Sequence, residues 1–292
     1  MIASEDIPAS EALTNRGMAA RLLGSRTGTT LVLAVYAIIA AGPLLLVLNN
    51  SLRPTSDIYR TPLGPPTLEG MGNFTTAWSR ASFSTFFFNS VFVTVGALIL
   101  GVGAATLAGY ALGRFKFPGR RTLSALFLAG MLLPIQLGVV PIFYLLQSMR
   151  LVDTHLGLIL VYAAHTLPVS ILLLSVFFRQ LPDELEEAAR LDGAGRFRIF
   201  FSVMLPLVRP ALATVIVVQC APIWNDFFYP LVLLRSADKY TLPVGLTAFM
   251  GQYQSDYGAL FAALAIVSAP MIILFVLATK HVIAGLTAGV GK

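Results

Sequence analysis

The chain consists mainly of long apolar stretches separated by short groups of charged residues. Five long intervals contain no Asp, Glu, Lys or Arg, and a sixth, residues 210–234, contains one acid, Asp226. A helix that crosses the hydrocarbon core of a bilayer needs about 20 mostly apolar residues. The pattern therefore predicts six membrane-spanning helices, near residues 29–48, 88–112, 123–147, 156–178, 210–234 and 258–279.

The composition agrees with an all-α membrane protein. Only 12% of the 292 residues are charged and 57% are hydrophobic, whereas about 25% of the residues in a soluble globular protein are charged. A soluble enzyme, a disordered chain and a disulfide scaffold are excluded, and the single Cys220 has no internal partner for a disulfide. The net charge of +6 arises from basic residues in the gaps between apolar runs, which favours a membrane protein over one that binds nucleic acid.

The distribution of basic residues predicts the orientation. The first apolar run is too long for the core of a signal peptide and follows three acids, so we expect a retained helix preceded by an N-terminal tail over residues 1–28. If this tail is inside, only six of the 20 Lys and Arg residues lie outside: Arg53, Arg60, Arg80, Arg150, Arg235 and Lys239. The excess on the other side predicts that both termini are cytoplasmic.

One cytoplasmic segment, residues 181–210, has the pattern of two short helices. Pro182 and the acids after it suit the start of a helix, and Gly193 suits a left-handed turn at its end. A second helix is expected from Gly195, with one apolar face formed by Phe197, Phe200, Phe201 and Met204. An amphipathic loop on lipid headgroups is the alternative, but the acidic first arm is better suited to a groove on a protein.

The same segment resembles the EAA signature of permeases from binding-protein-dependent ABC importers. The run Glu187-Ala188-Ala189-x-x-Asp192-Gly193-Ala194 is followed by Phe200, Val203, Leu205-Pro206-Leu207 and Pro210 at the spacing of that signature. The turn from Arg114 to Arg121, the run Trp224-Asn225-Asp226-Phe227 and the tail from Ala284 to Gly289 are similar to the carbohydrate group. The resemblance covers residues 29–292 and implies the smaller, maltose-type permease with a type I transmembrane domain.

The resemblance implies that residues 181–210 dock into a groove on a cytoplasmic ATPase. Glu187 would pair with a basic residue of the ATPase, small side chains would allow close approach, and Gly193 would form the bend. The coupling residues it implies are Glu187, Ala188, Ala189, Asp192, Gly193 and Ala194. It also implies an ATPase contact by the tail at Gly285, Leu286 and Thr287, for which a frayed terminus is the alternative.

Two further sets of residues are candidates for contact with the solute and its carrier. Trp224, Asn225, Asp226 and Gln219 are expected near the solute path, although Asp226 could instead be solvated at the outer interface and Gln219 could pack between helices. The outer loop with Gly251, Gln252 and Tyr253 corresponds to the loop that reaches the solute-binding protein in maltose-type systems. An ordinary capped loop is an equal alternative there.

No motif for enzymatic chemistry is present, and neither a Walker loop nor metal-binding spacing around the histidines is found. The resemblance therefore implies a translocation subunit without a cofactor of its own, with ATP and Mg²⁺ used by a separate ATPase. Its expected partners are a second homologous permease, two ATPase subunits, an external solute-binding protein and the lipid of a prokaryotic cell membrane. The expected cargo is a sugar or sugar derivative. A polyamine or glycerol phosphate importer and an ion-coupled secondary transporter remain alternatives.

Overall fold

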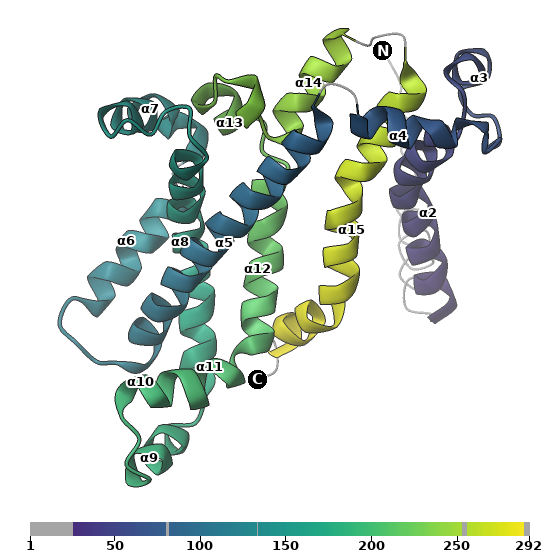
Figure 1. The fold of residues 1–292 in the computed structure, drawn as a ribbon. Helices are drawn as coiled ribbons and strands as arrows, with labels where there is room; N and C mark the ends of the chain where they lie inside the picture. The colour runs from purple at the N-terminus through teal and green to yellow at the C-terminus, as the bar shows by residue number, and fades with distance from the viewer. Residues whose placement is uncertain (1–25, 80–81, 133, 253–255, 289–292) are drawn as a thin grey trace, which may run out of the picture.

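The computed structural model describes residues 26–79, 82–132, 134–252 and 256–288. Every regular element in these residues is a helix, as the all-α prediction requires. Four of the helices are long and apolar enough to cross a bilayer. They are α2 (Arg26–Ser51), α5 (Phe83–Arg114), α8 (His155–Gln180) and α15 (Tyr257–Ala288) (Figure 1). They correspond to the first, second, fourth and sixth predicted spans.

The third predicted span is not one straight helix. It is divided into α6 (Arg120–Leu132) and the pair η2 (Ile135–Gly138) and α7 (Val139–Ser148), and the two parts meet at 93°. Pro134, with ψ 121°, lies at this break. Proline cannot donate a helical hydrogen bond and its ring clashes with the preceding turn, which explains why the prediction of a continuous helix over 123–147 is wrong.

The fifth predicted span is also interrupted. Helix α12 (Arg209–Trp224) is followed by a turn and then by α13 (Phe228–Leu233). The carboxylate of Asp226 accepts hydrogen bonds from the backbone N–H groups of Phe228, at 3.1 Å, and Tyr229, at 3.2 Å. Aspartate competes for backbone donors in this way and so favours helix starts over helix interiors. The expected continuous helix over 210–234 is therefore wrong beyond Trp224.

A second bend precedes α12. The short run of α10 (Arg196–Ile199), η3 (Phe200–Met204) and α11 (Leu205–Leu207) meets α12 at 72°. If each of the two bent pairs counts as one span, the described residues contain six candidate spans.

Helices α5 and α8 form the centre of the bundle. Small residues of α5 recur every four positions at Gly101, Ala105, Gly109 and Gly113, and all four are buried. A Cβ atom at Gly109 would lie 2.9 Å from Leu174 Cβ of α8. Such small residues let two membrane helices approach at backbone distance, so α5 and α8 pack along much of their length.

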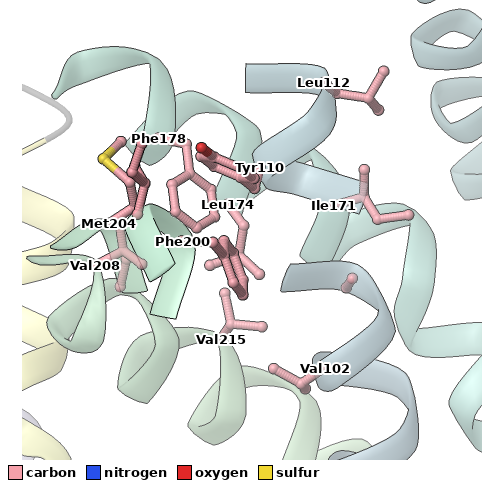
Figure 2. Close-up of a cluster of buried hydrophobic side chains, with 13 residues drawn as sticks. Val102, Tyr110, Leu112, Ile171, Leu174, Phe178, Phe200, Met204, Val208 and Val215 are labelled. Atoms are coloured by element: carbon pink, nitrogen blue, oxygen red, sulfur yellow. The ribbon is translucent and has the colours of Figure 1, made fainter. Parts of the chain in front are cut away.

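A cluster of buried side chains joins this pair to the following elements (Figure 2). Tyr110 of α5 lies against Phe178 of α8 and Phe200 of η3, with ring centroids 5.3 and 5.0 Å apart. Met204 of η3 and Val215 of α12 belong to the same cluster. The second arm of the 181–210 segment is therefore part of the hydrophobic core.

The short helices lie at two opposite ends of the bundle (Figure 1). At one end are α3 (Thr55–Arg60), α4 (Gly72–Ser79), α7, α13 and α14 (Leu242–Gln252), with η1 (Glu69–Met71) and η4 (Ala237–Lys239). At the other end are α9 (Glu184–Leu191) and α10. The segments predicted to lie outside and those predicted to lie inside are thus separated as the topology prediction requires. We refer to them as the outer end and the coupling end.

The segment 49–87, between the first two predicted spans, contains short helices. It is organised around Arg53, which is 2% exposed. The guanidinium donates hydrogen bonds to Asn50 Oδ1 at 3.0 Å and to Thr61 Oγ1 at 2.9 Å. A buried cation needs such acceptors, so Arg53 fixes α3 against the end of α2.

Candidate functional site

Helix α9 at the coupling end contains the motif that the sequence singles out. The helix starts at Glu184 with Asp183 before it, two residues later than expected from Pro182. Gly193 has φ +76°, which confirms the predicted left-handed turn. The N–H of Gly193 donates to Arg190 O and the N–H of Ala194 donates to Ala189 O, each at 3.0 Å. This is the hydrogen-bond pattern of a Schellman motif, in which glycine is favoured at the turn.

The second arm begins at Arg196 after Gly195, as predicted, but its apolar residues do not share one face. Residues Phe200–Met204 form a π-helical turn, which contains more residues per turn than an α-helix. Phe200 and Met204 are buried, whereas Phe197 is 83% and Phe201 57% exposed. The predicted single apolar face over these four residues is therefore wrong.

Both arms carry exposed residues, which we together call the docking surface. Glu187 and Ala188 are exposed on α9, and Leu191, 89% exposed, lies at the end of the same helix. Phe197 and Phe201 follow on the second arm. Ala189, by contrast, packs partly against the core cluster. The motif thus combines residues that face the bundle with residues that are free to meet another molecule.

A buried ion pair holds α9 against the bundle. Arg114, at the end of α5, donates through Nε to Glu186 Oε1 at 2.8 Å, and the two side chains are only 5% and 7% exposed. Arg114 also donates to Leu181 O at 2.8 Å and lies 2.7 Å from Asp183 Oδ1. Arg190 bonds the second oxygen of Glu186 at 3.1 Å. We call this group the Arg114 clamp.

Sequence reasoning overlooked the role of Glu186 because it selected the neighbouring Glu187 from the motif. Residues three positions apart on a helix share a face, and Glu186 lies three positions before Ala189, which packs on the core. The spacing of three positions between Glu186 and Ala189 could therefore have indicated that Glu186 faces the bundle.

A cavity of about 300 Å³, with several polar residues in its lining, lies toward the outer end, where the two broken spans meet. The Tyr229 hydroxyl, in α13, donates to Ile135 O, in the break of the third span, at 2.7 Å. The Tyr162 hydroxyl of α8 donates to Asp226 Oδ2 at 2.6 Å. The polar residues of the lining are Gln136, Tyr162, His165, Asn225, Asp226 and Tyr229. Of these, sequence reasoning identified Asn225 and Asp226.

Trp224 and Gln219, the other two path candidates, lie in helix packing within this chain. Each is 4% exposed. Trp224 Nε1 donates to Val267 O of α15 at 3.1 Å, and Gln219 Nε2 donates to Ser170 Oγ of α8 at 3.3 Å. The cavity residues Gln136, Tyr162 and His165 were overlooked, since only the proline near Gln136 indicated that the spans break at this level.

The remaining candidates lie near the edges of the described residues. Gly285, Leu286 and Thr287 belong by their backbone to the last part of α15, and Gly251 and Gln252 end α14. Tyr253 lies outside the described residues. Among the described residues, no group of three or more His, Cys, Asp or Glu side chains is arranged to hold a metal ion.

Comparison with known proteins gives consistent matches over most of the chain. Residues 101–287 match the family described as "Binding-protein-dependent transport system inner membrane component". The diacetylchitobiose uptake system permease protein NgcG of Streptomyces coelicolor is 38% identical over 260 residues, which cover 88% of this chain and 86% of that protein. The arabinooligosaccharides transport system permease protein AraQ of Halalkalibacterium halodurans is 36% identical over 268 residues, which cover 89% of this chain and 94% of that protein.

The fold also matches a solved structure. It is the crystal structure of a bacterial ABC transporter involved in the import of the acidic polysaccharide alginate. The match has a TM-score of 0.75 and 23% identity, and it covers 95% of this chain and 99% of the other. At this identity the match concerns the fold.

Proposed function

The chain belongs to the family of binding-protein-dependent transport system inner membrane components, and we propose that it is the permease subunit of an ATP-driven importer for a sugar or sugar derivative. Relatives that are 32–38% identical are named as permeases for diacetylchitobiose, for arabinooligosaccharides and for melibiose, raffinose and stachyose. They support an oligosaccharide as the cargo of this chain.

The observation that carries the proposal is the docking surface at the coupling end. It places an exposed carboxylate, Glu187, beside small and large apolar side chains that the chain itself leaves uncovered. Exposed large apolar side chains mark a contact with another protein or with a membrane, and the acids of α9 favour a protein, because helices that lie on lipid headgroups are usually basic. A carboxylate at the edge of such a contact forms a charge-assisted hydrogen bond with an arginine of the partner. We assign this partner as the ATPase subunit of the importer.

The assembly we propose contains this chain, a second homologous permease, two ATPase subunits and an external solute-binding protein in the cell membrane. A second solved structure with a similar fold is a bacterial alginate ABC transporter in complex with a periplasmic protein that holds an alginate pentasaccharide. ATP and Mg²⁺ would be bound by the ATPase, so this chain would contribute no catalytic residue. The coupling end would face the cytoplasm, in line with the distribution of Lys and Arg.

The test is uptake of labelled oligosaccharides by vesicles that contain the whole complex and its binding protein. We expect uptake to require ATP inside the vesicle and to continue when a protonophore collapses the proton gradient. Uptake that follows the ion gradient, with no need for ATP, would instead establish a secondary transporter.

A further inference from the structure

The two helix breaks described above lie at the same place in the bundle. Tyr229, near the start of α13, donates to Ile135 O, at the start of η2, at 2.7 Å, so the segments that follow the two breaks are in contact. Irregular backbone inside a membrane is tolerated where it is buried in protein or lines a water-filled cavity. In secondary transporters, broken helices of this kind commonly form the binding site of the solute, and the same physical reason applies to any solute path through a membrane. The cavity at the two breaks is therefore a candidate site.

The cavity has polar groups in its lining that this chain leaves exposed. Gln136, His165 and Asn225 are all exposed, although they lie within or beside membrane-spanning segments. Among the described residues, the Gln136 amide and the His165 ring have no hydrogen-bond partner, and Asn225 uses only its Nδ2, toward Ala221 O at 2.9 Å. Polar groups are costly against lipid. This face must therefore meet water, another protein or a polar solute.

The charge of the cavity restricts the solute. Asp226 is the only Asp, Glu, Lys or Arg among the described residues that line it. Its oxygens already accept three hydrogen bonds, from the Tyr162 hydroxyl and from the backbone of Phe228 and Tyr229. The carboxylate is therefore stabilised without a cation, and its negative charge disfavours an anionic solute. Amide, imidazole and phenol groups beside the aromatic ring of Phe228 suit hydroxyl groups on a ring with an apolar face.

We propose that this cavity is a solute-binding subsite of the permease that takes an uncharged oligosaccharide and excludes acidic ones. Gln136, His165 and Asn225 supply hydrogen bonds to sugar hydroxyl or acetamido groups, and Asp226 repels carboxylate sugars. This inference rests on the proposed function, because it assumes that a sugar passes this face. It specifies the chemical class of the sugar and the residues of this chain that meet it.

The first test compares Gln136→Ala and Asn225→Ala with Gln147→Ala, which removes an exposed amide of α7 that does not line the cavity. Complexes are reconstituted with one binding protein, and import of N,N′-diacetylchitobiose, raffinose and an arabinooligosaccharide is measured together with ATP hydrolysis. We expect the two cavity variants to import about three- to tenfold less sugar per ATP, the effect of one lost hydrogen bond. Gln147→Ala should match the wild type.

The outcomes separate the two levels of the proposal. If the wild-type complex imports no sugar of the panel, the proposed function fails, and the subsite with it. If it imports sugar and the cavity variants behave like Gln147→Ala, only the subsite is wrong. If the cavity variants lose the second permease during purification, the cavity is a subunit contact and the subsite is again wrong.

The second test probes access and charge directly. Cys220 is the only cysteine and is buried, so Gln136→Cys and Gln147→Cys can each be labelled in a Cys220→Ala background. We expect the thiol introduced by Gln136→Cys to react at least about threefold faster with a cationic than with an anionic methanethiosulfonate, because Asp226 lies in the same cavity. Imported sugar should slow this reaction. The thiol introduced by Gln147→Cys should show neither effect. Equal rates for the two reagents in Gln136→Cys, or no protection by sugar, would overturn the proposal.

Discussion

Arg114 Nε lies 2.8 Å from Glu186 Oε1, so the last residue of α5 is joined by a buried ion pair to the helix that bears the docking surface. Breaking such a pair by removing one charge is costly because the other charge remains buried. The Arg114 clamp is thus one joint, beside the packing of Ala189 and of the second arm on the core cluster, through which a movement of α9 can reach the membrane helices.

We expect Glu186→Gln to lower the free energy of unfolding by about 3 kcal/mol, since Arg114 would lose its main buried counter-charge. Asp183 would remain beside Arg114 but is 84% exposed in its side chain. The matched control is Glu184→Gln, an exposed acid of the same helix, which should change stability by less than about 0.5 kcal/mol. Thermal denaturation of the purified complex measures the stability of both variants. Equal melting midpoints for Glu186→Gln and Glu184→Gln would contradict the role of the clamp.

Gly193→Val should weaken recovery of the ATPase with the permease. The position has φ +76°, and a Cβ atom added there would meet no other atom within 4 Å, so the penalty in this chain is in the backbone and amounts to about 1–2 kcal/mol. Gly195→Val is the control, because Gly195 has equally open surroundings but φ −71°. Co-purification of the ATPase through a tag on this chain is the measurement. Equal recovery with both variants would count against the docking assignment.

Glu187→Ala should also reduce ATPase recovery and uptake while leaving the permease folded. Glu187 is exposed in this chain, unlike its neighbour Glu186, so its loss removes a contact with the partner worth about 1.5–3 kcal/mol. Glu184→Ala, one turn earlier, should have the smaller effect. Full ATPase recovery and full uptake in Glu187→Ala would return the segment to the alternative of a helix resting on lipid headgroups.

At the outer end, Asp153 should make stability depend on pH only under acidic conditions. Burial raises the pKa of this carboxyl, but hydrogen bonds from Ser236, from the backbone of Arg235 and from Lys239 outweigh burial and hold the pKa well below its usual range. Because the folded-state pKa is lowered, the stabilisation is complete above the unfolded pKa of about 4. This stabilisation is lost as the pH falls through the pKa that Asp153 has in the folded state.

The measurement for Asp153 is the difference in melting temperature between wild type and Asp153→Asn. We expect Asp153→Asn to melt lower by the same amount from about pH 5 to 8, and the difference to shrink below about pH 4. Asp238→Asn is the control, because Asp238 lies in η4, between the residues Ser236 and Lys239 that bond Asp153, and forms no side-chain ion pair among the described residues. A difference that instead changes between about pH 5 and 8 would assign the effect to another group.

The sequence predicted the helical class and four of the six spans well because long apolar runs are a strong signal. It missed the break at Pro134, where proline lacks a backbone N–H and its ring clashes with the preceding turn. It also missed the break after Trp224, where the Asp226 carboxylate bonds backbone N–H groups that a continuous helix would use. Gly193 was predictable because a left-handed turn leaves few choices of residue. The Arg114–Glu186 pair was not, since it joins residues 72 positions apart.

The residues that line the cavity could also be predicted only in part. Asn225 and Asp226 stood out as polar residues in an apolar run, whereas Gln136, Tyr162 and His165 are distant in sequence and meet only through the two breaks. Trp224 and Gln219, from the same apolar run, instead pack against α15 and α8. The face that an all-apolar helix turns toward its neighbours depends on packing, and the periodicity of its sequence does not reveal it.

The uninterrupted length of α5 has a mechanical consequence. Its 32 residues carry no internal proline and correspond to about 48 Å at 1.5 Å per residue. Arg114 ties one end to α9, and near the other end Asn89 donates to Asp238 O and Tyr240 O at 2.8 and 3.0 Å. A stiff rod of this length acts as a lever. A tilt of about 5° about its coupling end displaces the outer loop by about 4 Å, so a small motion at the coupling end would be enlarged at the outer end.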